Sequence, residues 1–248
     1  MLRTIEELSL QAWPAFEEQI YDGWILRFAE GYTKRANSVN PLYGSVIDLT
    51  EKIAYCEKAY AKRGLPAVFK LTGESTPAGL DRALEVRGYD RLDETSVRVL
   101  PLKDRRIAEG AAEQYPHVCD AWLTAYIRCA GIDNANTVEK LARILRSIPE
   151  ETFFAYVRGG TGIAACGLGV LDNGYLGCFD IAVDAAHRRK GYGGRIMEGL
   201  LAAGKQKGAK TAYLQVVAGN RPAERLYDSL GFQEIYRYWY RRKGPLLG

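Results

Sequence analysis

The chain has 248 residues, 47% hydrophobic and 26% charged, which excludes a disordered protein and allows one large or two ordinary globular domains. Its 34 basic and 30 acidic residues are interleaved and leave a net charge of +4, which suits an anionic ligand but does not by itself predict nucleic-acid binding. Five cysteines without a CxxC pair, and only two histidines, indicate neither a disulfide framework nor a metal site, so we expect free thiols in a reducing compartment.

The chain begins with a segment that does not resemble a targeting signal. Glu6 and Glu7 lie where a secretory signal needs a basic patch and an apolar run. No stretch approaches the ~18 uninterrupted apolar residues of a membrane-spanning helix. We therefore expect a cytoplasmic protein without a membrane partner. The sequence leaves the oligomeric state open, a homodimer included.

The first half of the chain predicts strands and helices in alternation. In chain order they are strands at 24–28 and 34–39, a helix at 51–63, a strand at 67–72, a short helix that ends at Gly88, and an alternating strand at 94–100. A linker is expected near residues 100–110, where a polar stretch follows the last strand.

The second half begins with a longer helical region. Its expected elements are a helical stretch at 121–148, strands at 152–157, 163–171 and 176–183, a glycine-rich turn and helix, a strand at 212–217, a short helix that ends at Gly231, and a strand at 235–240.

The two halves end alike, which indicates a weak internal repeat. In each half a buried strand runs into a turn with a Pro-Ala pair, a short helix stops at a glycine followed by an aromatic residue, and an alternating strand follows. Two related α/β units in tandem is the economical interpretation. Chance resemblance between two strand–helix–strand segments is the alternative, because such segments are common.

A basic, glycine-rich turn at residues 188–194 is the clearest candidate for a binding site. It lies between an apolar strand and an amphipathic helix, so backbone N–H groups and the helix N-terminus can face an anion. A nucleoside-triphosphate loop would need GxxxxGK followed by Ser or Thr, and a dinucleotide loop would need GxGxxG, and neither is present. The turn therefore predicts a phosphate site of another type.

Two motifs at matching spacing carry a family resemblance. Arg188, Gly191 and Gly193 fit the pattern RxxGxG, and the segment from Asn220 to Phe232 fits N-x-x-A-x-x-x-Y-x-x-x-G-F. With these residues the chain resembles the GNAT superfamily of acyl-CoA-dependent N-acyltransferases over roughly residues 175–235. Arg189 departs from the pattern, because the family often has glycine at this position.

The resemblance implies the fold and the coenzyme site. The fold would be α/β (α+β) with two tandem GNAT-like units, each a mixed, mostly antiparallel sheet flanked by helices. Residues 1–104 would form a degenerate unit without a coenzyme loop, and residues 105–248 the catalytic one. The residues that would bind acetyl-CoA are Ile181, Ala182, Val183, Arg188, Arg189, Lys190, Gly191, Tyr192, Gly193, Gly194, Asn220, Ala223 and Tyr227.

The implied reaction moves an acetyl group from acetyl-CoA to a small-molecule or peptide amine, without a metal. Tyr227 would be the general acid that protonates the departing thiolate, and a merely packed aromatic is the alternative. Asp180 would be the general base, and an ordinary strand-end carboxylate is the alternative. A non-catalytic protein that binds or senses acyl-CoA is the competing function.

The first half is expected to serve the acceptor side of the site. It has no glycine loop, and Leu84 stands at the position that corresponds to Tyr227. Arg27, Arg35 and Asn37 are candidates for recognising an acidic or carboxylate-bearing acceptor. Hydrogen bonding between strands and solvated arginines is the alternative for these three side chains.

Overall fold

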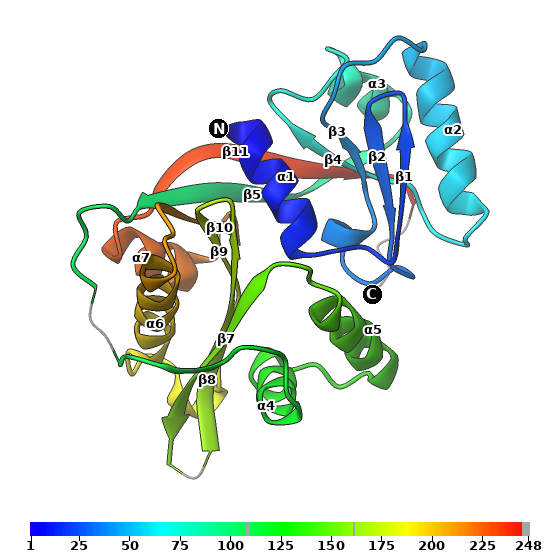
Figure 1. Cartoon of the computed structure of the whole chain (residues 1–248). Helices are drawn as coiled ribbons and strands as arrows, with labels where there is room; N and C mark the ends of the chain where they lie inside the picture. Colours follow the sequence, from blue (N-terminus) through cyan, green and yellow to red (C-terminus); the bar gives the residue numbers. More distant parts are fainter. Residues whose placement is uncertain (108–109, 161, 245–248) are drawn as a thin grey trace.

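A computed structural model of the chain describes residues 1–107, 110–160 and 162–244. Within these residues one eleven-stranded mixed sheet is flanked by helices, so the expected α/β class is confirmed (Figure 1). The elements of the first half are α1 (Leu2–Ala12), β1 (Glu17–Tyr21), β2 (Trp24–Phe28), β3 (Val39–Pro41), α2 (Leu49–Ala61), β4 (Val68–Thr72), α3 (Leu80–Val86) and β5 (Asp90–Pro101). Those of the second half are β6 (Glu113–Tyr115), α4 (Asp120–Ala130), α5 (Ala135–Arg146), β7 (Glu151–Gly159), β8 (Gly162–Asp172), β9 (Tyr175–Val183), α6 (Tyr192–Gln206), β10 (Thr211–Val217), α7 (Arg221–Ser229) and β11 (Gln233–Arg242).

Two of the expected elements are wrong. Residues 34–39 do not form a strand: Lys34–Ala36 is a 3₁₀ turn, because the Asn37 side chain bonds to the backbone of the preceding loop. The helical stretch at 121–148 is two helices, α4 and α5. Gly131 ends the first in a left-handed conformation (φ 70°), and the Asn134 side chain caps the second.

The last strand of each half is inserted between two strands of the other half: β11 lies between β4 and β5, and β5 lies between β11 and β10. The strand order is β1-β2-β3-β4-β11-β5-β10-β9-β8-β7-β6. β11 pairs antiparallel with β4 and β5, and β5 pairs antiparallel with β10. Figure 1 shows β5 and β11 as the long strands that join the two lobes. The predicted boundary at residues 104/105 therefore follows a strand that is built into both lobes, and the expected linker at 100–110 includes residues 108–109, which lie outside the described ones.

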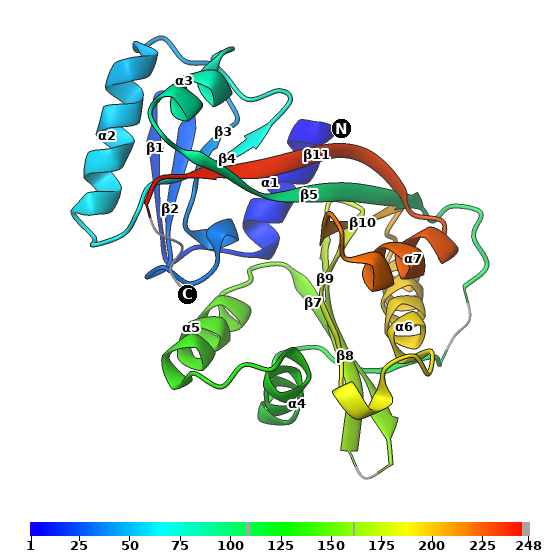
Figure 2. The same ribbon diagram turned by 180° about the vertical axis from the view of Figure 1, so that it is seen from behind.

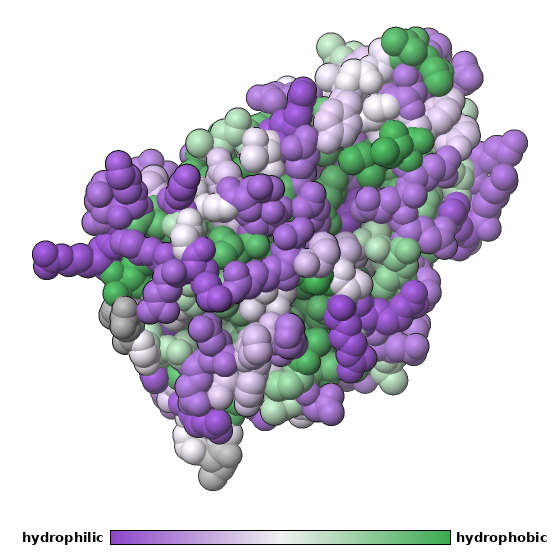
Figure 3. Space-filling view, viewed as in Figure 1, coloured by the Kyte–Doolittle hydropathy of each residue, from purple (hydrophilic) through white to green (hydrophobic). Residues whose placement is uncertain are grey.

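The helices cover both faces of the sheet and enclose three hydrophobic clusters. α6 packs on one face of β7–β9 and α4 on the other, as the front and back views show (Figures 1 and 2). α2 and α3 cover the strands of the first lobe. The N-terminal helix α1 crosses the joint, where Lys70 Nζ lies 2.5 Å from Glu6 Oε2 and both side chains are buried. Figure 3 shows that polar side chains cover most of the front face.

Candidate functional site

Strands β9 and β10 diverge in the middle of the sheet. They pair in parallel from Tyr175 opposite Thr211 to Cys178 opposite Leu214, and beyond this point no pairing joins them among the described residues. β9 continues for five residues, to Val183, and β10 for three, to Val217. The diverging ends leave strand edges that an extended ligand can reach.

A β-bulge on β9 lies directly after the point of divergence. Cys166 on β8 faces Ala182, while Leu168 faces Phe179, so β9 carries one extra residue there. Asp180 has a positive φ of 52° within this bulge. Bulges of this kind redirect a side chain next to functional sites. The result is that Asp180 lines the space between the diverging strands.

The glycine-rich turn lies at the start of α6. Gly191 occupies the N-cap position with φ 80°, and no side chain caps the helix. The first-turn N–H groups of a helix have no partner within it, so they remain available to an anion. A Cβ on Gly193 would lie 3.2 Å from Leu226 Cδ2 on α7, so this glycine permits close helix packing. Arg189 adopts φ 59°, a conformation that explains why glycine suits this position.

A cavity of about 820 Å³ runs from the glycine-rich turn to the divergence of β9 and β10. All residues expected to bind the coenzyme line this cavity except Lys190, whose ammonium donates to the Ala186 carbonyl oxygen at 3.0 Å. Arg188 and Arg189 are exposed at its rim. The two sequence motifs are thus brought together in space.

Tyr227 lies at the inner end of this cavity, on α7. Asn220 caps α7, because the Ala223 N–H donates to its side-chain oxygen at 3.4 Å, and this cap positions the helix beside the strand ends. The Tyr227 side chain is buried, and burial raises the pKa of its hydroxyl to about 12, with the nearby Cys178 adding to the shift. The phenol therefore stays protonated at neutral pH.

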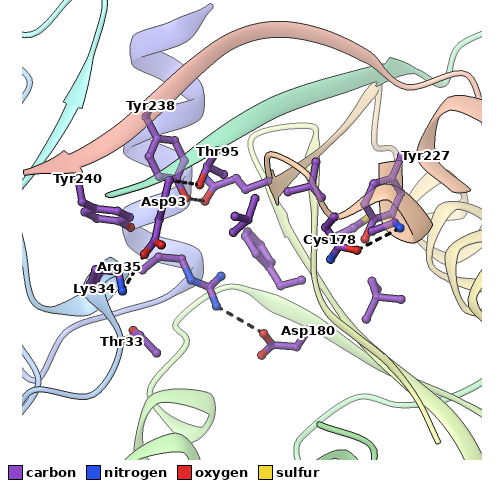
Figure 4. Close-up of a pocket in the computed structure, with 17 residues that line it drawn as sticks. Thr33, Lys34, Arg35, Asp93, Thr95, Cys178, Asp180, Tyr227, Tyr238 and Tyr240 are labelled. Carbon is purple, nitrogen blue, oxygen red and sulfur yellow. Dashed lines mark hydrogen bonds and ion pairs between the residues drawn. The ribbon is translucent and has the colours of Figure 1, made fainter. Parts of the chain in front are cut away.

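A second cavity, of about 520 Å³, lies between the lobes (Figure 4), and five of its lining residues also line the first cavity. Residues of the first half, among them Arg35 and Asp93, face residues of β9, β10, α7 and β11 across it. The residues that line both cavities are Asp180, Ile181, Asn220, Ala223 and Tyr227. Both candidate catalytic residues therefore lie where the two cavities join.

Asp180 is a buried carboxylate whose one ion-pair partner among the described residues is Arg35. Arg35 Nη2 lies 3.5 Å from the Asp180 Oδ1, and in the same part of the chain no hydrogen bond reaches the buried Oδ2. Burial raises the pKa of the Asp180 carboxyl above its usual range, while the charge of Arg35 and the Tyr126 hydroxyl act in the opposite direction. A carboxylate with a raised pKa is a better proton acceptor than an ordinary one.

The structure separates the three polar candidates of the first half. Arg35 lines the second cavity. Arg27 is buried and donates to the carbonyl oxygens of Leu10, Trp13 and Arg35, each at 2.8 Å, so its role is structural. Asn37 is buried in the loop it stabilises. Arg27 and Asn37 thus serve hydrogen bonding within the lobe, which was the alternative interpretation. Arg35 is the one of the three that lines the cavity, as a residue that recognises an acceptor would.

Sequence reasoning missed several residues that line these cavities. Tyr126 on α4 lines the first, and Tyr240 and the ion pair between Lys34 and Asp93 (2.7 Å) line the second. Neither Tyr126 nor Asp93 belongs to a motif, so no local signal marks them. The alternation of β11 does place Tyr238 and Tyr240 on one face, and that pattern could have identified them.

Neither a metal cluster nor a membrane-crossing helix is found in the described part of the chain. No group of three or more His, Cys, Asp or Glu side chains there is arranged to hold a metal ion. Across residues 1–107, 110–160 and 162–244, no helix combines the length and apolarity that crossing a bilayer requires.

Comparison with known proteins finds matches over almost the whole chain. The family model described as "Probable histone acetyltransferase Rv0428c C-terminal" matches residues 1–241. The uncharacterized N-acetyltransferase YobR of Bacillus subtilis is 30% identical over an alignment of 249 positions, which covers 98% of each chain.

Solved structures show the same fold. A GCN5-related N-acetyltransferase from Kribbella flavida superposes with a TM-score of 0.71 at 18% identity, covering 99% of this chain and 96% of its own. A tandem GNAT protein from the clavulanic acid biosynthesis pathway superposes with a TM-score of 0.61 at 13% identity, covering 79% and 70%. At these identities the likeness concerns the fold, which is the expected tandem GNAT type.

Proposed function

The chain belongs to the GNAT N-acetyltransferase family that includes the C-terminal part of the probable histone acetyltransferase Rv0428c, and from this premise we propose that it transfers an acetyl group from acetyl-CoA to an amine. The observation that carries the proposal is the junction of the two cavities at Asp180 and Tyr227. One cavity would hold the coenzyme and the other the acceptor. A proton acceptor and a proton donor line the point where the two reactants would meet.

The first cavity fits the coenzyme in its chemistry. The uncapped start of α6 and the exposed Arg188 and Arg189 suit a pyrophosphate. The unpaired edge of β9 from Phe179 to Val183 suits the amide groups of a pantetheine arm, because strand edges bind extended chains through backbone hydrogen bonds. Residues Ile181 to Val183 line this part of the cavity.

The bound coenzyme would supply a thioester that an amine can attack, forming a carbon–nitrogen bond as the carbon–sulfur bond breaks. Asp180 would accept the proton that the amine loses, since burial raises the pKa of its carboxyl. Tyr227 would donate a hydrogen bond to the departing sulfur. Because its pKa of about 12 exceeds that of an ordinary thiol, about 8.5, this hydroxyl acts through a strong hydrogen bond to the thiolate and gives up its proton only late.

Replacing the Tyr227 hydroxyl tests this proposal. We expect Tyr227→Phe to lower kcat for acetyl transfer by roughly 10²- to 10⁴-fold, the usual contribution of a positioned acid. Coenzyme affinity measured by calorimetry should change little, because the aromatic ring and its packing remain. Tyr21→Phe is the matched control: Tyr21 lies on the edge strand β1, stacked on Tyr55.

The readout is thiol release from acetyl-CoA over a panel of amines. Coenzyme binding without turnover of any amine, together with equal behaviour of Tyr227→Phe and wild type, would favour the competing function of a coenzyme-binding sensor.

A further inference from the structure

We infer that the cavity between the lobes binds a free α-amino acid, whose carboxylate pairs with Arg35 and whose amine takes the place of Arg35 beside Asp180. This inference rests on the proposed function and names its acceptor. It depends on three observations: the incomplete partnering of Arg35, two buried polar atoms without partners, and the rigid loop that presents Arg35 (Figure 4).

Arg35 is held in place mainly by aromatic rings. Its guanidinium carbon lies 4.3 Å from the ring centroid of Trp13 and 5.9 Å from that of Phe179. Among the described residues its one side-chain hydrogen bond is the 3.5 Å contact with Asp180. A guanidinium has five N–H donors in a planar fork that matches a carboxylate. Most of that donor capacity is therefore available to a ligand in the cavity.

The loop that carries Arg35 is built to hold a fixed shape. Thr33 has φ 56°, which is strained for a β-branched residue. The Asn37 side-chain oxygen accepts from the N–H groups of Ala29 and Gly31, and its amide donates to the Tyr32 and Thr33 carbonyl oxygens. Stored strain and a locked backbone are typical of binding sites, because they fix a recognition group before the ligand arrives.

Two residues that line the same cavity each have a buried polar atom without a hydrogen bond in the described part of the chain, and the chemistry of these atoms is complementary to a zwitterion. Asp180 Oδ2 has no hydrogen bond and would accept one from an ammonium. The Tyr240 hydroxyl is buried near the Tyr238 side chain, accepts and donates no well-formed hydrogen bond among the described residues, and would donate to a carboxylate. Burial raises the pKa of Tyr240 well above its ordinary value, so this donor keeps its proton. Unpaired buried polar groups cost stability unless a ligand satisfies them.

The spacing of the charges selects the α-amino acid. Arg35 and Asp180 form a long ion pair of 3.5 Å, so their charged groups are almost adjacent. A ligand that pairs with both needs its own opposite charges close together, as the ammonium and carboxylate on one carbon are. The cavity of about 520 Å³ also lies within the ordinary range for small-molecule sites, about 300–1,000 Å³.

This arrangement couples acceptor recognition to the activity of the base. The charge of Arg35 lowers the pKa of Asp180 against the effect of burial. A carboxylate that pairs with Arg35 removes part of this influence, so Asp180 becomes a stronger proton acceptor for the amine beside it. A simple amine, or the N-terminus of a peptide, has no carboxylate on the α-carbon. The ion pair between Arg35 and Asp180 therefore persists when such an acceptor binds.

Matched acceptors test the inference in the wild-type protein. Each set holds an amino acid, its amide as a mimic of a peptide N-terminus, and its decarboxylated amine: alanine, alaninamide and ethylamine, and tyrosine, tyrosinamide and tyramine. We expect at least one free amino acid to exceed its two partners in kcat/KM by roughly 10- to 100-fold, the size of a charge-assisted pair. Amides or amines that react as well as the amino acids would overturn the inference while leaving the proposed function intact.

The variant Arg35→Gln tests whether Arg35 recognises the acceptor carboxylate or only supports the fold. We expect it to lower kcat/KM for the amino acid by roughly 10- to 100-fold more than kcat/KM for the decarboxylated amine, because the amine has no carboxylate that could pair with Arg35. The control is Arg82→Gln on α3, an exposed side chain that pairs with Glu85. An equal loss for both acceptors would mean a structural role for Arg35 and would overturn the inference.

Calorimetry decides the inference even without turnover. The protein saturated with coenzyme A is titrated with each member of the most active set, or with the tyrosine set if none is active. Binding of the amino acid that weakens in Arg35→Gln and persists in Arg82→Gln supports the acceptor assignment, although absent turnover would contradict the proposed function. Equal binding of the amino acid and its amide would overturn the assignment.

Discussion

Burial and the charge of Arg35 act in opposite directions on the pKa of Asp180. The bulge on β9 turns its carboxylate into a buried position, where loss of solvent favours the protonated form. Arg35, 145 residues earlier in the chain, favours the ionised form. A carboxylate with a raised pKa ionises at a cost in free energy and accepts a proton more readily once ionised. This cost should lower the stability of the folded protein.

Asp180→Asn should show this trade between stability and activity. Because the pKa of Asp180 is raised on folding, the folded state binds its proton more tightly, and ionisation costs stability as pH rises above the unfolded value of about 4. At neutral pH the variant should be more stable than wild type, and this advantage should vanish below about pH 4. Its acetyl transfer should fall by about 10²-fold or more. Urea unfolding at pH 7 and pH 4, with thiol release, measures both effects.

Asp184, the residue that follows the same strand, provides a control whose pKa shift has the opposite sign. Its pKa is lowered, first by the hydrogen bond from the Ala186 N–H and then by His187. A lowered pKa contributes stability above the unfolded value, and this contribution is lost as pH falls through the folded value. Asp184→Asn should therefore be less stable than wild type at neutral pH. The same direction of change in both variants would contradict the assignment of a costly base to Asp180.

At the scale of elements, substitutions at the two ends of α6 can distinguish an effect on backbone conformation from an effect on ligand binding. Gly191 begins the helix at φ 80° and Gly208 follows its end at φ 92°, and a Cβ at either position would meet nothing within 4 Å. Alanine at either position should therefore cost a similar amount of stability, about 1 kcal/mol, through its left-handed backbone. Only the first position lines the cavity that we propose for the coenzyme.

We expect Gly191→Ala to weaken coenzyme A binding by about 10-fold or more, because the first-turn N–H groups shift from the phosphates. Gly208→Ala should leave binding unchanged at equal loss of stability. Calorimetry with coenzyme A and thermal unfolding test the pair. Equal affinities in the two variants would show that the turn at residues 188–194 is not a phosphate site.

Sequence patterns located most elements, and the exceptions have physical reasons. The split between α4 and α5 was signalled by Gly131 and Asn134, a stop and a cap close together in the chain, but the apolar periodicity on both sides concealed it. The turn at Lys34–Ala36 was not predictable, because buried bonds from the Asn37 side chain override the local preference. The motif residues were found because motifs are local, whereas Arg35 and Asp180 meet only through the fold.

At the scale of the whole molecule, the repeat was visible in the sequence and the exchange of strands was not. Similar strand–helix–strand endings reveal two related units, but nothing in them says whether β5 pairs with its own half or with the other one. Through the exchange, residues of the first half line the second cavity. The exchange brings the loop of Arg35 opposite β9 and places Tyr240 of β11 beside it.

Because of this exchange, neither half should fold alone. Residues 1–104 would lack β11, whose Arg241 pairs with Asp81 of α3 at 2.8 and 2.9 Å. Residues 105–248 would lack β5, the partner of both β10 and β11, and Glu6 of α1, which accepts from the Tyr236 hydroxyl at 2.7 Å. Each fragment would expose hydrophobic surface and unpaired strand edges.

We expect each fragment alone to show no cooperative thermal unfolding, and a co-expressed pair to form a 1:1 complex that unfolds cooperatively and binds coenzyme A. Circular dichroism, size-exclusion chromatography and calorimetry measure these properties, with the intact chain as the control. A fragment 105–248 that unfolds cooperatively and binds coenzyme A on its own would mean that β10 and β11 close against each other without β5. The first half would then be an addition to a self-sufficient domain, and the cavity that contains Arg35 would not be required for the fold.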